Sequence, residues 1–216
     1  MDQTPMTNTV DGSWTKTGNF SWTTFGSVPP LGLGWLSYKR KYLPLLDSNT
    51  DYGTEWAINM RIQNAALQDT YAASLRPNLH RGDENTDEGS FVLSNQATST
   101  AGSATRTEVV TRISGVKTSF FLDWGYPGSE ASFHNVTVAS GGGSTILYVN
   151  GSKRYTYGFD TNIPSSTQTT HLGINSADIG ASFNIETWRH FSWLNYKPSD
   201  DEVINTIHPA MAGFNP

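Results

Sequence analysis

The sequence contains no cysteine, so disulfide bonds cannot stabilise the fold. Charged residues are also sparse, at 15% of the 216 residues, and the acidic ones outnumber the basic ones to give a net charge of −5. Nucleic-acid binding depends on clustered Lys and Arg, and this composition argues against it. No apolar run reaches the roughly 18 residues that a membrane-spanning helix needs, and the N-terminus lacks a basic segment followed by an apolar one. We therefore expect a soluble chain without a signal peptide or a membrane partner.

What is abundant is Gly, Ser, Thr, Asn and aromatic residues, the last at 12% of the chain. This mixture favours short β-strands and polar loops over helices. A chain of 216 residues is long enough for one well-buried domain. The composition therefore predicts an all-β protein with a single main domain.

The clearest local signal is a two-strand hairpin over residues 133–150. Val136 and Val138 belong to an apolar, β-branched run, residues 141–143 are three consecutive glycines, and residues 146–149 resume the apolar run. Asn150-Gly151 then predicts a second tight turn. Because an isolated hairpin is marginally stable in water, it needs a sheet around it and a second layer over its apolar face.

Other segments have the composition of further strands. Residues 55–62 alternate apolar with polar side chains and predict a half-buried strand. Ser114-Gly115 predicts a hairpin turn between two of the remaining segments. The other predicted strands cover residues 90–94, 108–113, 117–123, 154–159, 171–174 and the region from 183 onward, and residues 27–51 suit a long loop or short edge strands.

This order of segments resembles the laminin-G-like and concanavalin A-like lectin-glucanase jelly rolls over residues 52–208. The resemblance rests on Phe133-His134-Asn135-Val136-Thr137-Val138, on Leu147-Tyr148-Val149-Asn150-Gly151, and on the closing stretch 183–201. It implies an antiparallel β-sandwich with one short C-terminal helix. Ser199 and Glu202 form a capping-box pattern that places the start of this helix, predicted over residues 200–207.

We predict two parts, an N-terminal arm and extension with a first strand at residues 1–50, and a jelly-roll domain at residues 51–216. Residues 1–13 are polar and contain little that could be buried. We expect this arm to become ordered only against a neighbouring subunit or a larger particle.

Two loops hold candidate binding residues. Asp83, Glu84, Asp87 and Glu88 form the densest acidic cluster, which predicts either a solvated loop or a calcium site, since hard oxygen ligands suit Ca²⁺. The preceding tripeptide, Arg81-Gly82-Asp83, is the sequence that integrin-binding proteins display on loops, although so short a motif often occurs by chance.

The second loop contains Asp123, Trp124 and Tyr126 among Gly and Pro. Flat rings exposed on a loop suit stacking against a sugar or anchoring a protein partner, whereas buried rings would pack over the end of the sandwich. These three residues are the predicted glycan or partner site.

Catalytic signatures are missing from the sequence. Glycoside hydrolysis needs two carboxylates facing each other across a cleft, whereas Glu55, Glu108 and Glu186 are single acids on separate predicted strands. The five histidines lack metal-ligand spacing. We therefore expect a protein that is not an enzyme and that needs no cofactor, apart from the calcium alternative.

The sequence favours a structural or surface protein of a larger assembly, such as a phage or viral capsid decoration or fibre protein. Its expected partners are copies of itself and that assembly, and its expected location is the virion surface or the extracellular space. A carbohydrate-binding, lectin-like module is the first alternative, and a polysaccharide-active enzyme of the jelly-roll class is the second.

Overall fold

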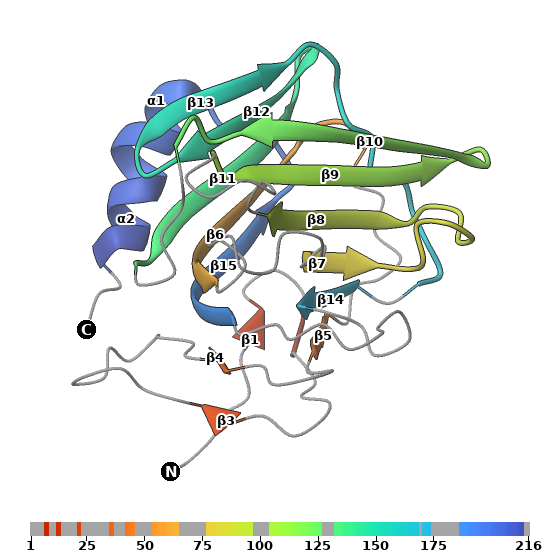
Figure 1. Ribbon diagram of the computed structural model, residues 1–216, viewed down its shortest axis with the longest axis horizontal. Coiled ribbons are helices and arrows are strands. Elements are labelled where there is room, and N and C mark those ends of the chain that lie inside the picture. The colour runs from red at the N-terminus through yellow and green to blue at the C-terminus, as the bar shows by residue number, and fades with distance from the viewer. Residues whose placement is uncertain are drawn as a thin grey trace.

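The computed structural model describes residues 53–64, 77–96, 104–126, 132–168, 170–173 and 186–213, and five short strands nearer the N-terminus. These residues form two antiparallel sheets that pack face to face, with a helical segment at the C-terminal end of the chain (Figure 1). The predicted fold class, an all-β sandwich with a short C-terminal helix, is confirmed.

The first sheet has six strands and the second has five. In sheet order, the first contains β10 (Val116–Asp123), β9 (Arg106–Ile113), β8 (Phe91–Gln96), β7 (Pro77–Arg81), β14 (Thr170–Gly173) and β5 (Tyr42–Leu45). The second contains β13 (Ser152–Tyr157), β12 (Ser144–Val149), β11 (His134–Gly141), β6 (Trp56–Asn64) and β15 (Glu186–Leu194). The edge strands β10 and β13 lie on the same side of the sandwich and contact each other.

Three hairpins join neighbouring strands through two-residue turns. The central residues are Ser114-Gly115 between β9 and β10, Gly142-Gly143 between β11 and β12, and Asn150-Gly151 between β12 and β13. Each central residue has a positive φ, between 50° and 85°. Such turns match the twist of the flanking strands and favour Gly and Asn, which is why these sequences predicted all three turns.

The space between the sheets is filled by apolar side chains from both. Trp56, Ile58, Met60 and Ile62 of β6 are fully buried there, together with residues of β8 to β12. The sandwich core is thus the one implied by the alternating pattern of residues 55–62.

The opposite face of β6 is buried as well, which corrects the prediction of a half-buried strand. Ala57 is fully buried, Asn59 is 1% exposed and Arg61 is 6% exposed. The C-terminal helical segment covers this face, where Val203 packs with Ala57 and with residues of β11 and β12. Sequence alternation alone did not reveal that helical cover.

The helical segment is longer than predicted. It comprises α1 (Asp200–Glu202), a π-helical stretch at Val203–Ile207 and α2 (His208–Gly213). The Ser199 hydroxyl accepts a hydrogen bond from the Glu202 backbone N–H at 3.1 Å, which confirms the predicted N-cap. The Glu202 carboxylate accepts from the Tyr196 hydroxyl at 2.6 Å.

The first 50 residues contribute short strands. Thr7–Asn8 (β1) pairs with Gly12–Ser13 (β2), and Ser21–Trp22 (β3) pairs with Trp35–Leu36 (β4). β5 joins the six-stranded sheet by pairing with β14, so that sheet takes its edge strand from the region predicted as an extension. Of the predicted arm at residues 1–13, only β1 and β2 are described, and the ordering of the arm against a partner stays a prediction.

Candidate functional site

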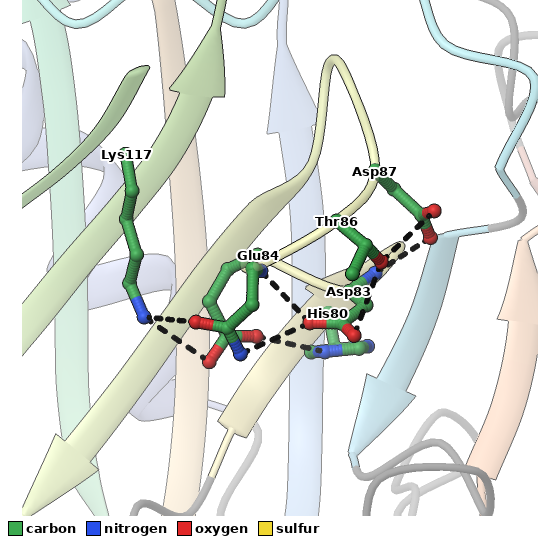
Figure 2. Close-up of polar contacts among 7 residues, drawn as sticks. His80, Asp83, Glu84, Thr86, Asp87 and Lys117 are labelled. Atoms are coloured by element: carbon green, nitrogen blue, oxygen red, sulfur yellow. Dashed lines mark hydrogen bonds and ion pairs between the residues drawn. The ribbon is translucent and has the colours of Figure 1, made fainter. Parts of the chain in front are cut away.

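The loop between β7 and β8 carries the predicted acidic cluster, and its side chains bind groups of the protein itself (Figure 2). The Asp87 carboxylate accepts from the Asp83 backbone N–H at 2.8 Å. The Asp83 carboxylate accepts from the backbone N–H of Asn85 at 2.8 Å and from the Thr86 hydroxyl at 3.1 Å. These bonds close the loop into a compact turn.

Glu84 points away from those two aspartates, towards the six-stranded sheet. Its carboxylate lies 3.9 Å from His80 Nε2 and 3.5 Å from Lys117 Nζ. The contact with His80 is the largest cause that lowers the pKa of Glu84 from 4.5 to about 2, and Lys117 adds to it against the opposing effect of burial. Glu84 therefore fastens the loop to β7 and β10.

Glu88 takes a third direction and accepts from the backbone N–H groups of Ser114 and Gly115 in the β9–β10 turn. These two bonds are the main causes that lower its pKa. Glu84 and Glu88 thus bind donors outside the loop, whereas Asp83 and Asp87 share the Thr86 hydroxyl. No group of three or more metal-ligating side chains occurs among the described residues. The calcium alternative for Asp83, Glu84, Asp87 and Glu88 stays a prediction, and the structure shows these carboxylates bound to donors of the protein.

The Arg81-Gly82-Asp83 tripeptide does not present its arginine. Arg81 is fully buried, and its guanidinium donates to the carbonyl of Gly89 at 3.1 Å and to the carbonyl of Pro164 at 2.5 Å. An adhesion motif must expose this side chain, so the tripeptide serves the fold.

The three residues of the predicted site, Asp123, Trp124 and Tyr126, differ in how far their side chains are buried. Trp124 is fully buried in the sandwich core and donates from its indole nitrogen to the Thr107 hydroxyl at 2.9 Å. The expectation that its ring is exposed for stacking is wrong, because the side chain follows the inward alternation of β10. Asp123 is exposed and Tyr126 is half-buried, so only these two remain at the surface.

Tyr126 stands at one end of a row of rings that we call the aromatic edge. It consists of Tyr126 beyond β10 and of Tyr155, Tyr157 and Phe159 on and after β13. Tyr155 is 37% exposed and Phe159 is 69% exposed. Tyr157 joins the two sheets by stacking on Phe120 of β10, with ring centroids 4.0 Å apart and planes 6° apart.

The backbone under these rings is fixed by hydrogen bonds. The carbonyl of Phe159 accepts from the Thr145 hydroxyl at 2.9 Å, and the carbonyl of Tyr126 accepts from the Thr105 N–H at 3.0 Å. The Tyr126 hydroxyl also accepts from the Asn150 side-chain amide at 3.0 Å. Exposed rings on a fixed backbone lose little entropy when they bind a ligand.

The sequence contains a signal for this edge. Tyr155, Tyr157 and Phe159 recur at every second residue in a segment predicted to be a strand, which places them on one side of it. A row of three aromatic residues on one face of a strand indicates a binding surface only if the strand lies at the edge of its sheet, as β13 does.

A second polar network lies under the C-terminal helix. His208 Nδ1 accepts from the Gly151 backbone N–H at 2.6 Å, so the proton is on Nε2, which donates to the Thr137 hydroxyl at 3.0 Å. Thr137 then donates to the Asn59 side chain at 2.8 Å. Burial lowers the pKa of His208 to about 4, and the network requires the neutral ring.

Glu55 and Glu108, two of the three acids predicted on separate strands, bind different donors. Glu55 accepts from the Gly142 backbone N–H at 3.0 Å, and Glu108 accepts from the Ser119 hydroxyl at 2.5 Å. The Glu186 side chain lies outside the described residues. In the described part of the chain, no helix is long and apolar enough to cross a membrane.

Comparison with known proteins finds no matching family model and no matching curated protein. Solved structures do match. A botulinum neurotoxin type C structure, whose title concerns cell entry through two ganglioside molecules, superposes with a TM-score of 0.62 at 11% identity, over 94% of this chain and 46% of that chain. The binding domain of botulinum neurotoxin serotype G matches with a TM-score of 0.62 at 12% identity, over 94% and 47%.

A heptameric SAP-like pentraxin from Limulus polyphemus matches with a TM-score of 0.58 at 15% identity, over 81% of this chain and 83% of that chain. The present chain therefore spans about half the length of the neurotoxin domains but most of the pentraxin. At these identities the likeness concerns the fold alone. It is the concanavalin-like jelly-roll sandwich, and the narrower laminin-G-like resemblance stays a prediction.

Proposed function

We propose that this protein is a non-catalytic carbohydrate-binding module whose ligand lies along the aromatic edge. The observation that carries the proposal is the exposure of Tyr155 and Phe159 on a fixed backbone at the side of the sandwich. Flat, partly apolar rings stack on the apolar faces of sugars, while hydroxyls such as that of Tyr126 supply polar contacts.

The dimensions of the edge favour an oligosaccharide. Residues 154–157 belong to β13 and cover about 10 Å, at about 3.3 Å per residue, and Phe159 follows just beyond the strand. Several rings in a row along that length offer successive stacking positions. Botulinum neurotoxin type C, which has this fold, enters cells through interaction with two ganglioside molecules, and this supports sugar binding by a protein of this architecture.

The test is a glycan array followed by calorimetry with the full 216-residue chain and with Tyr155→Ala/Phe159→Ala. We expect the double variant to lose roughly tenfold or more in affinity, because each ring contact contributes about 0.5–1.5 kcal/mol. Phe121→Ala is the matched control, since Phe121 has the same 37% exposure as Tyr155 but lies beneath Arg106, 3.8 Å from its guanidinium. Equal affinity in the double variant and the wild type would refute the proposal.

A second candidate, a surface component of a larger assembly, is favoured by the edge strands. β10 and β13 both end their sheets on the same side and are largely exposed, so a second copy could add strands there. The pentraxin that matches most of the chain is described as heptameric. Light scattering after size exclusion tests this candidate: a monomer at all concentrations that does not attach to a particle would oppose it.

A further inference from the structure

Arg154 lies at the Tyr126 end of the aromatic edge, in an irregular position of β13. The pairing of β12 with β13 shifts after Leu147, which pairs with Tyr155, whereas Tyr148 pairs with Lys153. Arg154 is therefore the extra residue of a β-bulge. Bulges re-aim a side chain, and they are over-represented next to binding sites.

The bulge determines the side of the sheet on which the Arg154 guanidinium lies. Lys153 faces the helix side of the sheet and pairs with Asp200 at 3.0 Å. Arg154 instead reaches the other side and lies over the Tyr126 ring, 4.8 Å from its centroid. Tyr126 is itself held by the Asn150 amide, so the ring that supports the guanidinium is fixed.

The Arg154 side chain is exposed at the surface. Among the described residues, no Asp or Glu forms an ion pair with it, whereas its neighbour Lys153 is paired. A guanidinium held over an aromatic ring has several N–H groups left for a ligand, and the spacing of these groups matches the two oxygens of a carboxylate or sulfate.

We propose that Arg154 is the anion-recognising end of the aromatic edge, and that the preferred ligand is an acidic oligosaccharide whose carboxylate or sulfate group binds this guanidinium. The proposal rests on the proposed function, because the rings of Tyr155 and Phe159 hold the remaining sugars. The protein carries a net charge of −5, so the attraction is local to this residue and does not arise from the overall field.

The experiment compares three probes that share one neutral parent: sialyllactose, sulfolactose and lactose, titrated into the full-length protein. We expect at least one acidic probe to bind more tightly than lactose. Arg154→Gln should lower the affinity for that probe by about 10-fold to 100-fold, since a charge-assisted hydrogen-bond pair is worth about 1.5–3 kcal/mol, and should leave lactose unchanged. The affinity of Arg154→Lys for that probe should lie between those of the wild type and Arg154→Gln. Lysine keeps the positive charge but lacks the planar pair of N–H donors of the guanidinium.

Lys153→Gln is the matched control, since it removes a neighbouring exposed charge that is already paired. We expect it to change the affinity for all three probes less than twofold or so. The two acidic probes separate a carboxylate from a sulfate ligand.

The outcomes distinguish the two proposals. If lactose and both acidic probes bind equally, and Arg154→Gln changes none of them, the assignment of Arg154 is wrong while sugar binding at the edge stands. If none of the three probes and no glycan on the array binds, both proposals are overturned.

Discussion

The acidic loop between β7 and β8 and the aromatic edge along β13 were both rich in candidate binding groups, but they differ in what the fold leaves available. In the loop, the carboxylates of Asp83, Glu84, Asp87 and Glu88 all accept bonds from protein donors. At the edge, Tyr155 and Phe159 remain exposed and Arg154 has no carboxylate partner among the described residues. A dense cluster of functional groups in the sequence is therefore a poor guide to a binding site, because other groups of the protein can bind every one of them.

The largest loss of stability should come from replacing Trp124, which lies in the core next to the aromatic edge. Trp124→Ala should lower the free energy of unfolding by about 3–5 kcal/mol, because the indole is fully buried and hydrogen-bonded. Urea unfolding followed by circular dichroism measures this change. A loss below about 1 kcal/mol would place Trp124 with the exposed rings and break the distinction drawn here.

The network beneath the C-terminal helix is another set of polar groups that bind one another inside the protein. The pKa of His208 is lowered by burial from 6.5 to about 4, so the neutral ring stabilises the folded state fully above pH 6.5. As the pH falls from 6.5 towards 4, His208 becomes protonated in the unfolded state but stays neutral in the folded state. The free energy of unfolding therefore declines by about 3 kcal/mol.

Urea unfolding across this pH range tests the assignment. His208→Asn should be less stable than wild type near neutral pH, with a smaller decline in the same window. An identical pH slope in both proteins would show that His208 is not the group responsible.

Glu84→Gln should have a smaller effect on stability, and this effect should be present at neutral pH and disappear in a lower pH window than that of His208. The lowered pKa of Glu84, about 2 instead of 4.5, means that its stabilisation is present above pH 4.5 and is lost as the pH falls towards 2. The side chain is 19% exposed, so solvent screening reduces the expected loss at neutral pH to about 1–2 kcal/mol. The difference between wild type and variant should shrink at about pH 3, and a constant difference would contradict the role of the carboxylate.

The smallest stability effect should come from the edge itself. Phe159→Ala should change the free energy of unfolding by less than about 0.5 kcal/mol, because the ring is 69% exposed. Thermal unfolding checks this expectation. A loss comparable to that of Trp124→Ala would show that the ring supports the fold, and the proposed binding surface would lose its main member.

Local sequence determined the turns and most of the strands of this protein. Ser114-Gly115, Gly142-Gly143 and Asn150-Gly151 each specify a two-residue turn, because few residue types tolerate a positive φ. Ser199 likewise fixed the start of the C-terminal helix by binding the Glu202 N–H. These features depend on a few adjacent residues, and the alternation of apolar side chains then gave the inward face of β6.

Tertiary structure alone decided which groups remain at the surface. Trp124 and Tyr126 are two residues apart, yet one is fully buried and the other half-buried, since burial depends on side chains from distant segments. The outer face of β6 is covered by a helix that begins more than a hundred residues later. Arg81 is buried where it donates to the carbonyl of Gly89, in the loop that follows it, and to the carbonyl of the distant Pro164. A binding surface consists of the side chains that long-range packing leaves exposed. The spacing of residues along the chain does not by itself determine which side chains these are.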